Sequence, residues 1–168
     1  FAEEEPTPHI SIVVCAYNAE DTLDDCLQGI AGLDYPCFET IVVDDGSTDC
    51  TAAIASAYDV QLIQTTNRGL SSARNTGASA ATGEIVAYLD SDARPDPDWL
   101  RYLAHAFTSS DVDGVGGPNL APPESGTVAQ CVAQAPGGPV HVMVSDTAAE
   151  HLPGCNLALR KSTWEQIG

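Results

Sequence analysis

Runs of hydrophobic residues alternate with helical patterns along the first two thirds of the chain. Continuous apolar, β-branched runs are typical of strands buried on both faces, whereas apolar residues every three or four positions indicate amphipathic helices. The predicted strands cover residues 10–16, 40–43, 60–64, 84–89 and 112–116. The predicted helices cover 19–31, 49–57, 70–81 and 97–107. This repeat predicts an α/β fold with a mostly parallel sheet and helices on both of its faces.

Capping residues set the helix boundaries that we expect. Short polar side chains favour the N-cap position, and glycine favours the C-terminal end of a helix. The predicted N-caps are Asn18, Ser47 or Thr48, and Asp96, and the helices 19–31 and 70–81 are expected to end at Gly32 and Gly83.

The pattern becomes irregular after residue 117. Residues 118–139 contain five prolines, which predicts loops with one short helix near 128–133. Strands are expected at 140–144 and 157–159, followed by a helix from Ser162. We therefore divide the chain into a flexible acidic tail (1–8) and one domain (9–168). The domain has a regular half (9–117) and a less regular half (118–168).

Polar residues follow three of the predicted strands directly. They are Ala16-Tyr17-Asn18, Asp44-Asp45 and Asp90-Ser91-Asp92. The carboxyl ends of parallel strands meet at one edge of a sheet, and ligands bind in the crevice beyond that edge. The three clusters are therefore expected to gather at a ligand site.

Asp90 and Asp92 are candidates to hold a divalent cation. Mg²⁺ and Mn²⁺ prefer oxygen ligands and often share them with substrate phosphates. No lysine or arginine lies closer in the sequence than Arg94 to neutralise the pair. The alternative is that both aspartates only serve a turn.

Asp44 is expected to face the ligand and to accept hydrogen bonds from a base edge or a ribose hydroxyl. Asp45 or Ser47 is expected to act locally, although one of the two aspartates could instead cap the following helix. Arg68 and Arg74 are two of only six basic residues, and arginine suits phosphate partners. We expect Arg74 to bind the ligand and Arg68 to form a surface ion pair.

Composition restricts the partners. The chain has 24 acidic and 6 basic residues, a formal net charge of −18, which disfavours nucleic-acid binding because such a surface repels phosphate backbones. The six cysteines form no CxxC pair, so we expect reduced, structural thiols and a cytoplasmic protein. Apolar runs are too short for a membrane span, and no phosphate loop, GxGxxG or GxSxG motif is present.

An ordered set of segments resembles the family 2 glycosyltransferases from about residue 9 to the end of the chain. The segments are ISIVVCAYNAEDTLDDCL, TIVVDDGSTDCT, NRGLSSARNTGASAATGEIVAYLDSDARPDPDWL and LPGCNLALRKSTWEQIG. The resemblance implies a Rossmann-like GT-A fold and a nucleotide-diphosphate sugar donor, most often a UDP-sugar. It further implies metal-assisted transfer, with inversion, to a hydroxyl of a carbohydrate, lipid-linked or protein acceptor.

The resemblance also implies roles for individual residues. Residues matching Ala16, Tyr17 and Asn18 border the nucleoside, Asp44 contacts the base, and Arg74 helps to hold the nucleotide. Asp90, Ser91 and Asp92 match the segment that binds ribose, diphosphate and Mn²⁺ or Mg²⁺, with Asp92 the closer metal ligand. The stretch Gly154-Cys155-Asn156 matches the segment that lines the acceptor side.

The sequence departs from the family at the catalytic base. The family's carboxylate base follows the segment that matches 164–168, so we expect a C-terminally truncated domain whose base lies beyond Gly168. Asp146 and Glu150 do not match its position. The alternative is a non-catalytic nucleotide-sugar-binding module or an inactive fragment. A nucleotidyltransferase is disfavoured because residues 10–25 contain no lysine, arginine or glycine.

If the rest of the domain is missing, we expect an apolar face to be exposed over residues 140–168, and two copies of the chain could dimerise through that face. Membrane association through segments outside this chain stays open, at the cytoplasmic face of a membrane.

Overall fold

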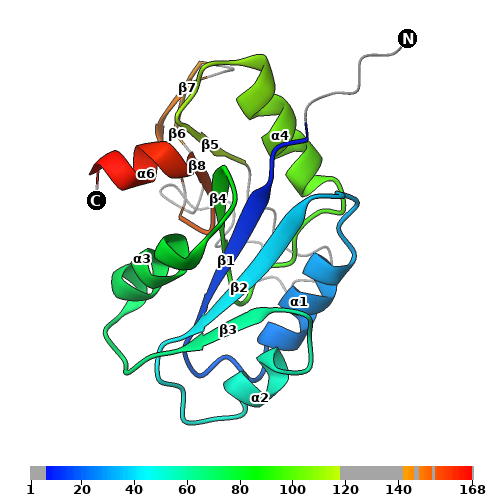
Figure 1. Ribbon diagram of the computed structural model, residues 1–168, viewed down its shortest axis with the longest axis vertical. Coiled ribbons are helices and arrows are strands. Elements are labelled where there is room, and N and C mark those ends of the chain that lie inside the picture. Colours follow the sequence, from blue (N-terminus) through cyan, green and yellow to red (C-terminus); the bar gives the residue numbers. More distant parts are fainter. Residues whose placement is uncertain (1–6, 118–141, 146–147, 153, 168) are drawn as a thin grey trace, which may run out of the picture.

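The computed structural model describes residues 7–117, 142–145, 148–152 and 154–167. Their elements are shown in Figure 1. In chain order they are β1 (Ile10–Ala16), α1 (Leu23–Ala31), β2 (Phe38–Asp44), α2 (Thr51–Ala55), β3 (Gln61–Gln64), α3 (Leu70–Ala80), β4 (Ile85–Asp90), α4 (Trp99–Ser109), β5 (Gly114–Gly116), β6 (Val142–Ser145), β7 (Ala148–His151), β8 (Asn156–Arg160) and α6 (Lys161–Ile167).

A six-stranded sheet in the order β3-β2-β1-β4-β8-β5 forms the centre of the fold. The first four strands in this order are parallel, β8 runs antiparallel to β4, and β5 runs antiparallel to β8. The predicted α/β fold with a mostly parallel sheet is confirmed. The predicted fifth strand, however, is shorter than expected and lies at the antiparallel edge, because its pairing partner is β8, some 40 residues later in the chain. Strands β6 and β7 form a separate antiparallel pair.

Helices cover both faces of the sheet (Figure 1). Successive side chains of a strand point to opposite faces, so β1 contributes to two hydrophobic clusters. Ile10, Ile12 and Val14 pack with residues of α1, α2 and α4. Val13 packs with residues of α3 on the other face, where Trp164 of α6 also lies. No helix within the described ranges is long and apolar enough to cross a membrane.

Three helices begin later than the capping pattern predicts. Helix α1 begins at Leu23, because the Ala19 carbonyl accepts hydrogen bonds from the N–H groups of Thr22 and Leu23 in a preceding turn. Helices α2 and α4 begin at Thr51 and Trp99. The predicted N-caps Asn18, Ser47 and Thr48 are therefore wrong. Asp96 lies two residues before Asp98, the N-cap of α4, and its side chain accepts a hydrogen bond from the Asp98 N–H at 2.9 Å. Helix α3 ends at Ala80 rather than near Gly83, and the helix expected near 128–133 lies outside the described residues.

Close packing of α3 onto the sheet places its functional residues. Gly77 faces β1 and β2, and a Cβ atom there would lie 2.3 Å from Val13 Cγ1 and 3.2 Å from Val43 Cγ2. Both valines are fully buried. The absence of a side chain at Gly77 therefore fixes how near α3 lies to the sheet.

Asp45 orders the loop that leads into α3. Its side chain is 4% exposed and accepts hydrogen bonds from the Thr65 hydroxyl (3.0 Å) and from the N–H groups of Arg68 (3.0 Å) and Gly69 (2.7 Å). Burial raises the pKa of this carboxyl, but these hydrogen bonds together with the Arg68 charge outweigh burial and lower the pKa below its ordinary value. The start of α3 is thus tied to the end of β2.

We predict that Gly77→Ala destabilises the fold. Alanine favours a helix over glycine by about 1 kcal/mol, but overpacking a buried site costs about 1–3 kcal/mol, and the buried strand leaves Val13 no room to move. The free energy of unfolding, measured by urea denaturation, should therefore fall. Ser71→Ala on the exposed part of α3 is the control. A Gly77→Ala protein more stable than wild type would contradict the packing.

We predict that Asp45→Asn lowers the free energy of unfolding by about 1–2 kcal/mol at neutral pH, because charge-assisted hydrogen bonds are lost. The folded-state pKa lies below the unfolded value of about 3.9. Stabilisation is therefore complete above that unfolded value and is lost as the pH falls through the folded pKa. The difference in the free energy of unfolding between wild type and Asp45→Asn should therefore become smaller in acid. The exposed Asp111→Asn control should have the wild-type free energy of unfolding at every pH. A gap independent of pH would refute this role of the charge.

Candidate functional site

The carboxyl ends of four strands form a row at one edge of the sheet. Asp44, the last residue of β2, lies opposite Ala16 of β1 and Gln64 of β3. Asp90, the last residue of β4, lies opposite Cys15 of β1. The three polar clusters that follow β1, β2 and β4 are therefore brought together, as the topology rule predicts.

Asp44 is held rigidly at the centre of this row. Its side chain is only 2% exposed. One carboxylate oxygen accepts a hydrogen bond from the Ser47 N–H (2.9 Å), and the other accepts one from Gln64 Nε2 (3.3 Å). Each oxygen keeps a further lone pair. Gln64 was not among the site residues expected from the sequence, and its position as the last residue of β3 was the available signal.

The loops after β1 and β2 are joined by reciprocal hydrogen bonds. The Asn18 N–H donates to Ser47 Oγ, and the Thr48 N–H donates to Asn18 Oδ1, both at 2.9 Å. The Ala19 N–H donates to Thr51 Oγ1 at 2.8 Å. Asn18 adopts φ 49°, a left-handed conformation that asparagine tolerates better than most residues. The carboxamide of Asn18 thus braces the two loops against each other.

Tyr17 projects from this braced turn. Its side chain is 53% exposed, whereas Ala16 before it is buried and accepts a hydrogen bond from the Asp45 N–H at 2.9 Å. The aromatic ring therefore borders the edge of the sheet and is open to solvent.

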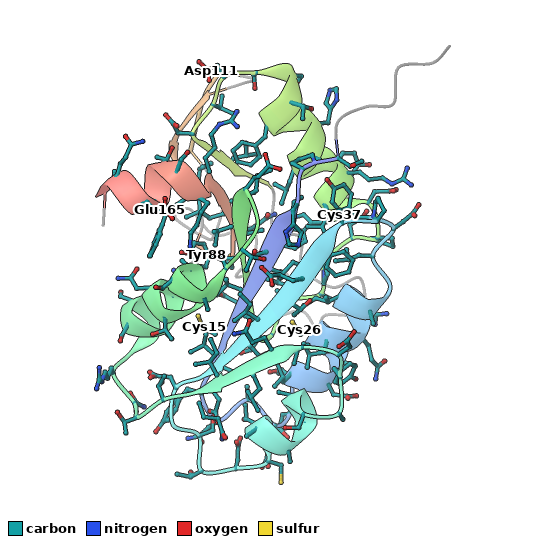
Figure 2. The ribbon with its side chains drawn as sticks, viewed as in Figure 1. Cys15, Cys26, Cys37, Tyr88, Asp111 and Glu165 are labelled. Atoms are coloured by element: carbon teal, nitrogen blue, oxygen red, sulfur yellow. The ribbon has the colours of Figure 1, made fainter. Side chains whose placement is uncertain are left out.

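Among the described residues, only Arg74 of α3 forms an ion pair with an acidic residue at the ends of these strands. Its Nη2 lies 3.2 Å from Asp90 Oδ1 and donates to the Gly154 carbonyl at 3.0 Å. The guanidinium also lies 5.6 Å from the ring centroid of Tyr88, which belongs to the α3 face of the sheet (Figure 2). Arg68, in contrast, takes part in none of the ion pairs between described residues, so the ion pair expected for it is not observed.

The two candidate metal ligands differ in their surroundings. Asp90 is half-buried and pairs with Arg74, whereas Asp92 is exposed and pairs with no arginine or lysine in the described part of the chain. Ser91 between them is half-buried. Within the described ranges no three His, Cys, Asp or Glu side chains are arranged to hold a metal. The carboxylates suit Mg²⁺ or Mn²⁺, but a cation here needs further oxygens from a ligand or water.

Two cysteines near the site lie on opposite faces of the sheet: Cys15 of β1 packs on the α3 face, and Cys26 of α1 packs on the other face (Figure 2). Burial raises the pKa of Cys15 to about 12, an effect that Arg74 opposes and Asp90 reinforces. Burial, with the charges of Asp92 and Asp90, raises the pKa of Cys26 to about 12. Both are therefore neutral thiols at physiological pH and behave as core residues. Cys15, Cys26, Cys37 and Cys50 are free thiols, and Cys131 lies outside the described residues.

The acceptor-side residues named from the sequence are placed only in part. Gly154 and Asn156 lie at the entrance to β8, where Asn156 Oδ1 accepts a hydrogen bond from Trp99 Nε1 at 3.0 Å. Asp146 lies outside the described residues, and Glu150 belongs to β7. Within the apolar face expected over 140–168, the side chains of 140–151 are not described; in α6, Ile167 is 71% exposed and Trp164 packs against the cluster on the α3 face of the sheet.

Solved structures resemble this chain over most of its length. The mannosyltransferase PcManGT of Pyrobaculum calidifontis, in complex with GDP-Man and Mn²⁺, matches with a TM-score of 0.70 and 27% identity over 96% of this chain and 47% of its own. TarS of Staphylococcus aureus matches with a TM-score of 0.69 and 25% identity over 95% and 49%. Glucosyl-3-phosphoglycerate synthase of Mycobacterium tuberculosis, with Mn²⁺ and UDP-glucose, gives 0.57 and 27% over 65% and 43%.

Sequence comparison leads to the same family. Glycosyltransferase AglE of Haloferax volcanii is 36% identical over 132 residues, which are 73% of this chain and 43% of that protein. The putative glycosyltransferase EpsH of Bacillus subtilis is 37% identical over 102 residues, 58% of this chain and 30% of its own. The chain thus spans less than half the length of these relatives. The profile of the glycosyl transferase family 2 matches residues 11–163, and the chain belongs to that family.

Proposed function

We propose that this chain forms the donor-binding part of an inverting glycosyltransferase that moves a sugar from a UDP-sugar to an acceptor hydroxyl with the help of Mn²⁺ or Mg²⁺. One observation carries the proposal: Asp44, the Arg74–Asp90 pair and the exposed Asp92 meet at the carboxyl edge of one sheet. Structural neighbours solved with UDP-glucose or GDP-Man and Mn²⁺ support a nucleotide-diphosphate sugar as the donor.

The base and ribose would lie over the ends of β1 and β2. The Asp44 carboxylate is fixed by two donors and can accept a further hydrogen bond from a base N–H. Tyr17 offers an exposed aromatic ring beside it, and Asn18 keeps the turn between them in shape. Ala16 contributes backbone to the same rim.

The diphosphate would lie toward the end of β4. Arg74 supplies guanidinium donors that suit phosphate oxygens, and the Asp90-Ser91-Asp92 turn supplies a hydroxyl and carboxylates for ribose and cation. Asp92 and Asp90 are the proposed ligands of the divalent cation, which, when bound, offsets the negative charge of the departing nucleoside diphosphate. In a chain of net charge −18, a bound cation also reduces the repulsion of an anionic donor.

Transfer also needs a base that takes the proton of the acceptor hydroxyl. We assign no described residue to that step. Carbohydrate, lipid-linked and protein hydroxyls are all compatible with the proposal.

We predict that Asp92→Asn weakens Mn²⁺-dependent UDP binding about tenfold or more, because the neutral amide is a poor ligand for a hard cation. Isothermal titration calorimetry with UDP and GDP, each with and without Mn²⁺, measures this. Asp59→Asn is the control, since Asp59 is exposed and precedes β3 at the opposite edge of the sheet.

Equal Mn²⁺-dependent affinity in Asp92→Asn and wild type would remove Asp92 from the metal site. Tighter binding of GDP than of UDP would show that the donor nucleotide carries guanine rather than uracil. Nucleotide binding without sugar transfer or hydrolysis would instead favour a non-catalytic nucleotide-sugar-binding module.

A further inference from the structure

Gly154 and Arg74 are packed directly against each other across 80 residues of sequence. The Gly154 carbonyl accepts a hydrogen bond from Arg74 Nη2 at 3.0 Å. A Cβ atom at Gly154 would lie 2.6 Å from Nη1 and 2.9 Å from Nη2 of the guanidinium. A side chain at position 154 would therefore require the guanidinium, the flexible end of Arg74, to move.

The guanidinium is held on three sides. Asp90 Oδ1 lies 3.2 Å from the same Nη2 that donates to Gly154, and the Tyr88 ring lies beside it with its centroid at 5.6 Å. The Arg74 side chain is 25% exposed, so a ligand can still reach it. Because one nitrogen serves both Asp90 and Gly154, the positions of the Asp90 carboxylate and of the Gly154 carbonyl together set how the guanidinium is oriented.

The segment that carries Gly154 is also fixed from the opposite face of the sheet. Asn156 pairs with Leu89 in the β4–β8 ladder, and its side-chain oxygen accepts the hydrogen bond from Trp99 Nε1. The Asn156 carbonyl in addition accepts a hydrogen bond from the Gly117 N–H at 3.4 Å. Residues 154–156 are thus held between α3 and α4, so the Gly154 carbonyl has a defined place.

We propose that Gly154 is a positioning residue for Arg74, so that the segment 154–156 sets the geometry of the guanidinium at the donor site. The inference rests on the proposed function, in which Arg74 binds the donor diphosphate. It makes the donor site a composite of two parts of the chain, with β8 and the segment before it completing a site otherwise built on β1, β2 and β4. Gly154 acts through Arg74 and touches no donor atom itself.

Calorimetry with UDP and Mn²⁺ tests this through a double-variant cycle. Gly154→Ala displaces the guanidinium and should weaken UDP binding about tenfold, a loss similar to that in Arg74→Lys, whose ammonium lacks the planar fork. In the Arg74→Lys background, Gly154→Ala should add less than about twofold, because residues that act through one another are not additive. Gly114→Ala is the matched control: its Cβ would lie 3.0 Å from Leu159 Cδ2 in the same sheet, away from Arg74.

Wild-type affinity in Gly154→Ala, or the same fold loss in both backgrounds, would overturn the inference, and the second result would reveal a general packing effect. If wild type binds neither UDP nor GDP with Mn²⁺, the proposed function fails instead. In that case, amide hydrogen exchange tests the contact between Arg74 and Gly154 without any ligand. In Arg74→Lys, the amides of residues 154–158 should exchange about fivefold faster than in wild type. Unchanged exchange there would overturn the positioning contact.

Discussion

Two neighbouring carboxylates are buried at the end of β2, and the architecture of the site depends on how their charges are satisfied. Burying a carboxylate without hydrogen bonds is prohibitively costly. Asp44 and Asp45 are 2% and 4% exposed, and the donors that satisfy them come from loops on either side. Asp44 accepts hydrogen bonds from Ser47 and from Gln64 at the end of β3, and Asp45 accepts them from the loop before α3. A single dipeptide thereby fixes where two loops lie.

The position of α3 in turn determines where Arg74, the positively charged side chain of the site, lies. The helix begins directly after Gly69, whose N–H binds Asp45, and it packs against β1 through Gly77. One turn into the helix, Arg74 meets Asp90 of β4 and the Gly154 carbonyl. The local negative charge is therefore balanced at Asp90 but not at Asp92, so in the proposed function the Arg74 side would take the anionic diphosphate and the Asp92 side the divalent cation.

The sequence allowed the sheet and the gathering of polar residues at its carboxyl edge to be predicted, because both follow from local patterns. Strands such as 10–16 are continuous apolar runs, and parallel strands with crossover helices leave one edge for Asp44 and Asp90. Helix starts were not predictable in the same way. Asn18, Ser47 and Thr48 are residues that favour N-caps, but here their side chains or N–H groups bond the neighbouring loop.

Contacts between distant segments explain the remaining differences. The antiparallel place of β5 depends on pairing with β8, and no local pattern encodes a partner some 40 residues away. The hydrogen bond of Gln64 to Asp44 requires the register of β2 and β3. Likewise, the contact between Gly154 and Arg74 depends on where α3 packs, so the sequence motif alone did not reveal it.

The central claim is that a nucleoside diphosphate and a divalent cation bind together at the carboxyl edge of the sheet. Paramagnetic broadening by Mn²⁺ in a ¹⁵N-labelled sample, recorded with and without UDP, locates the ion directly. With UDP, we expect the broadening to be strongest for the amides of residues 90–93 and to extend to those of 16–18 and 154–156. Amides of 59–61 and 108–111 should stay sharp. Broadening centred elsewhere, or identical with and without UDP, would contradict the account.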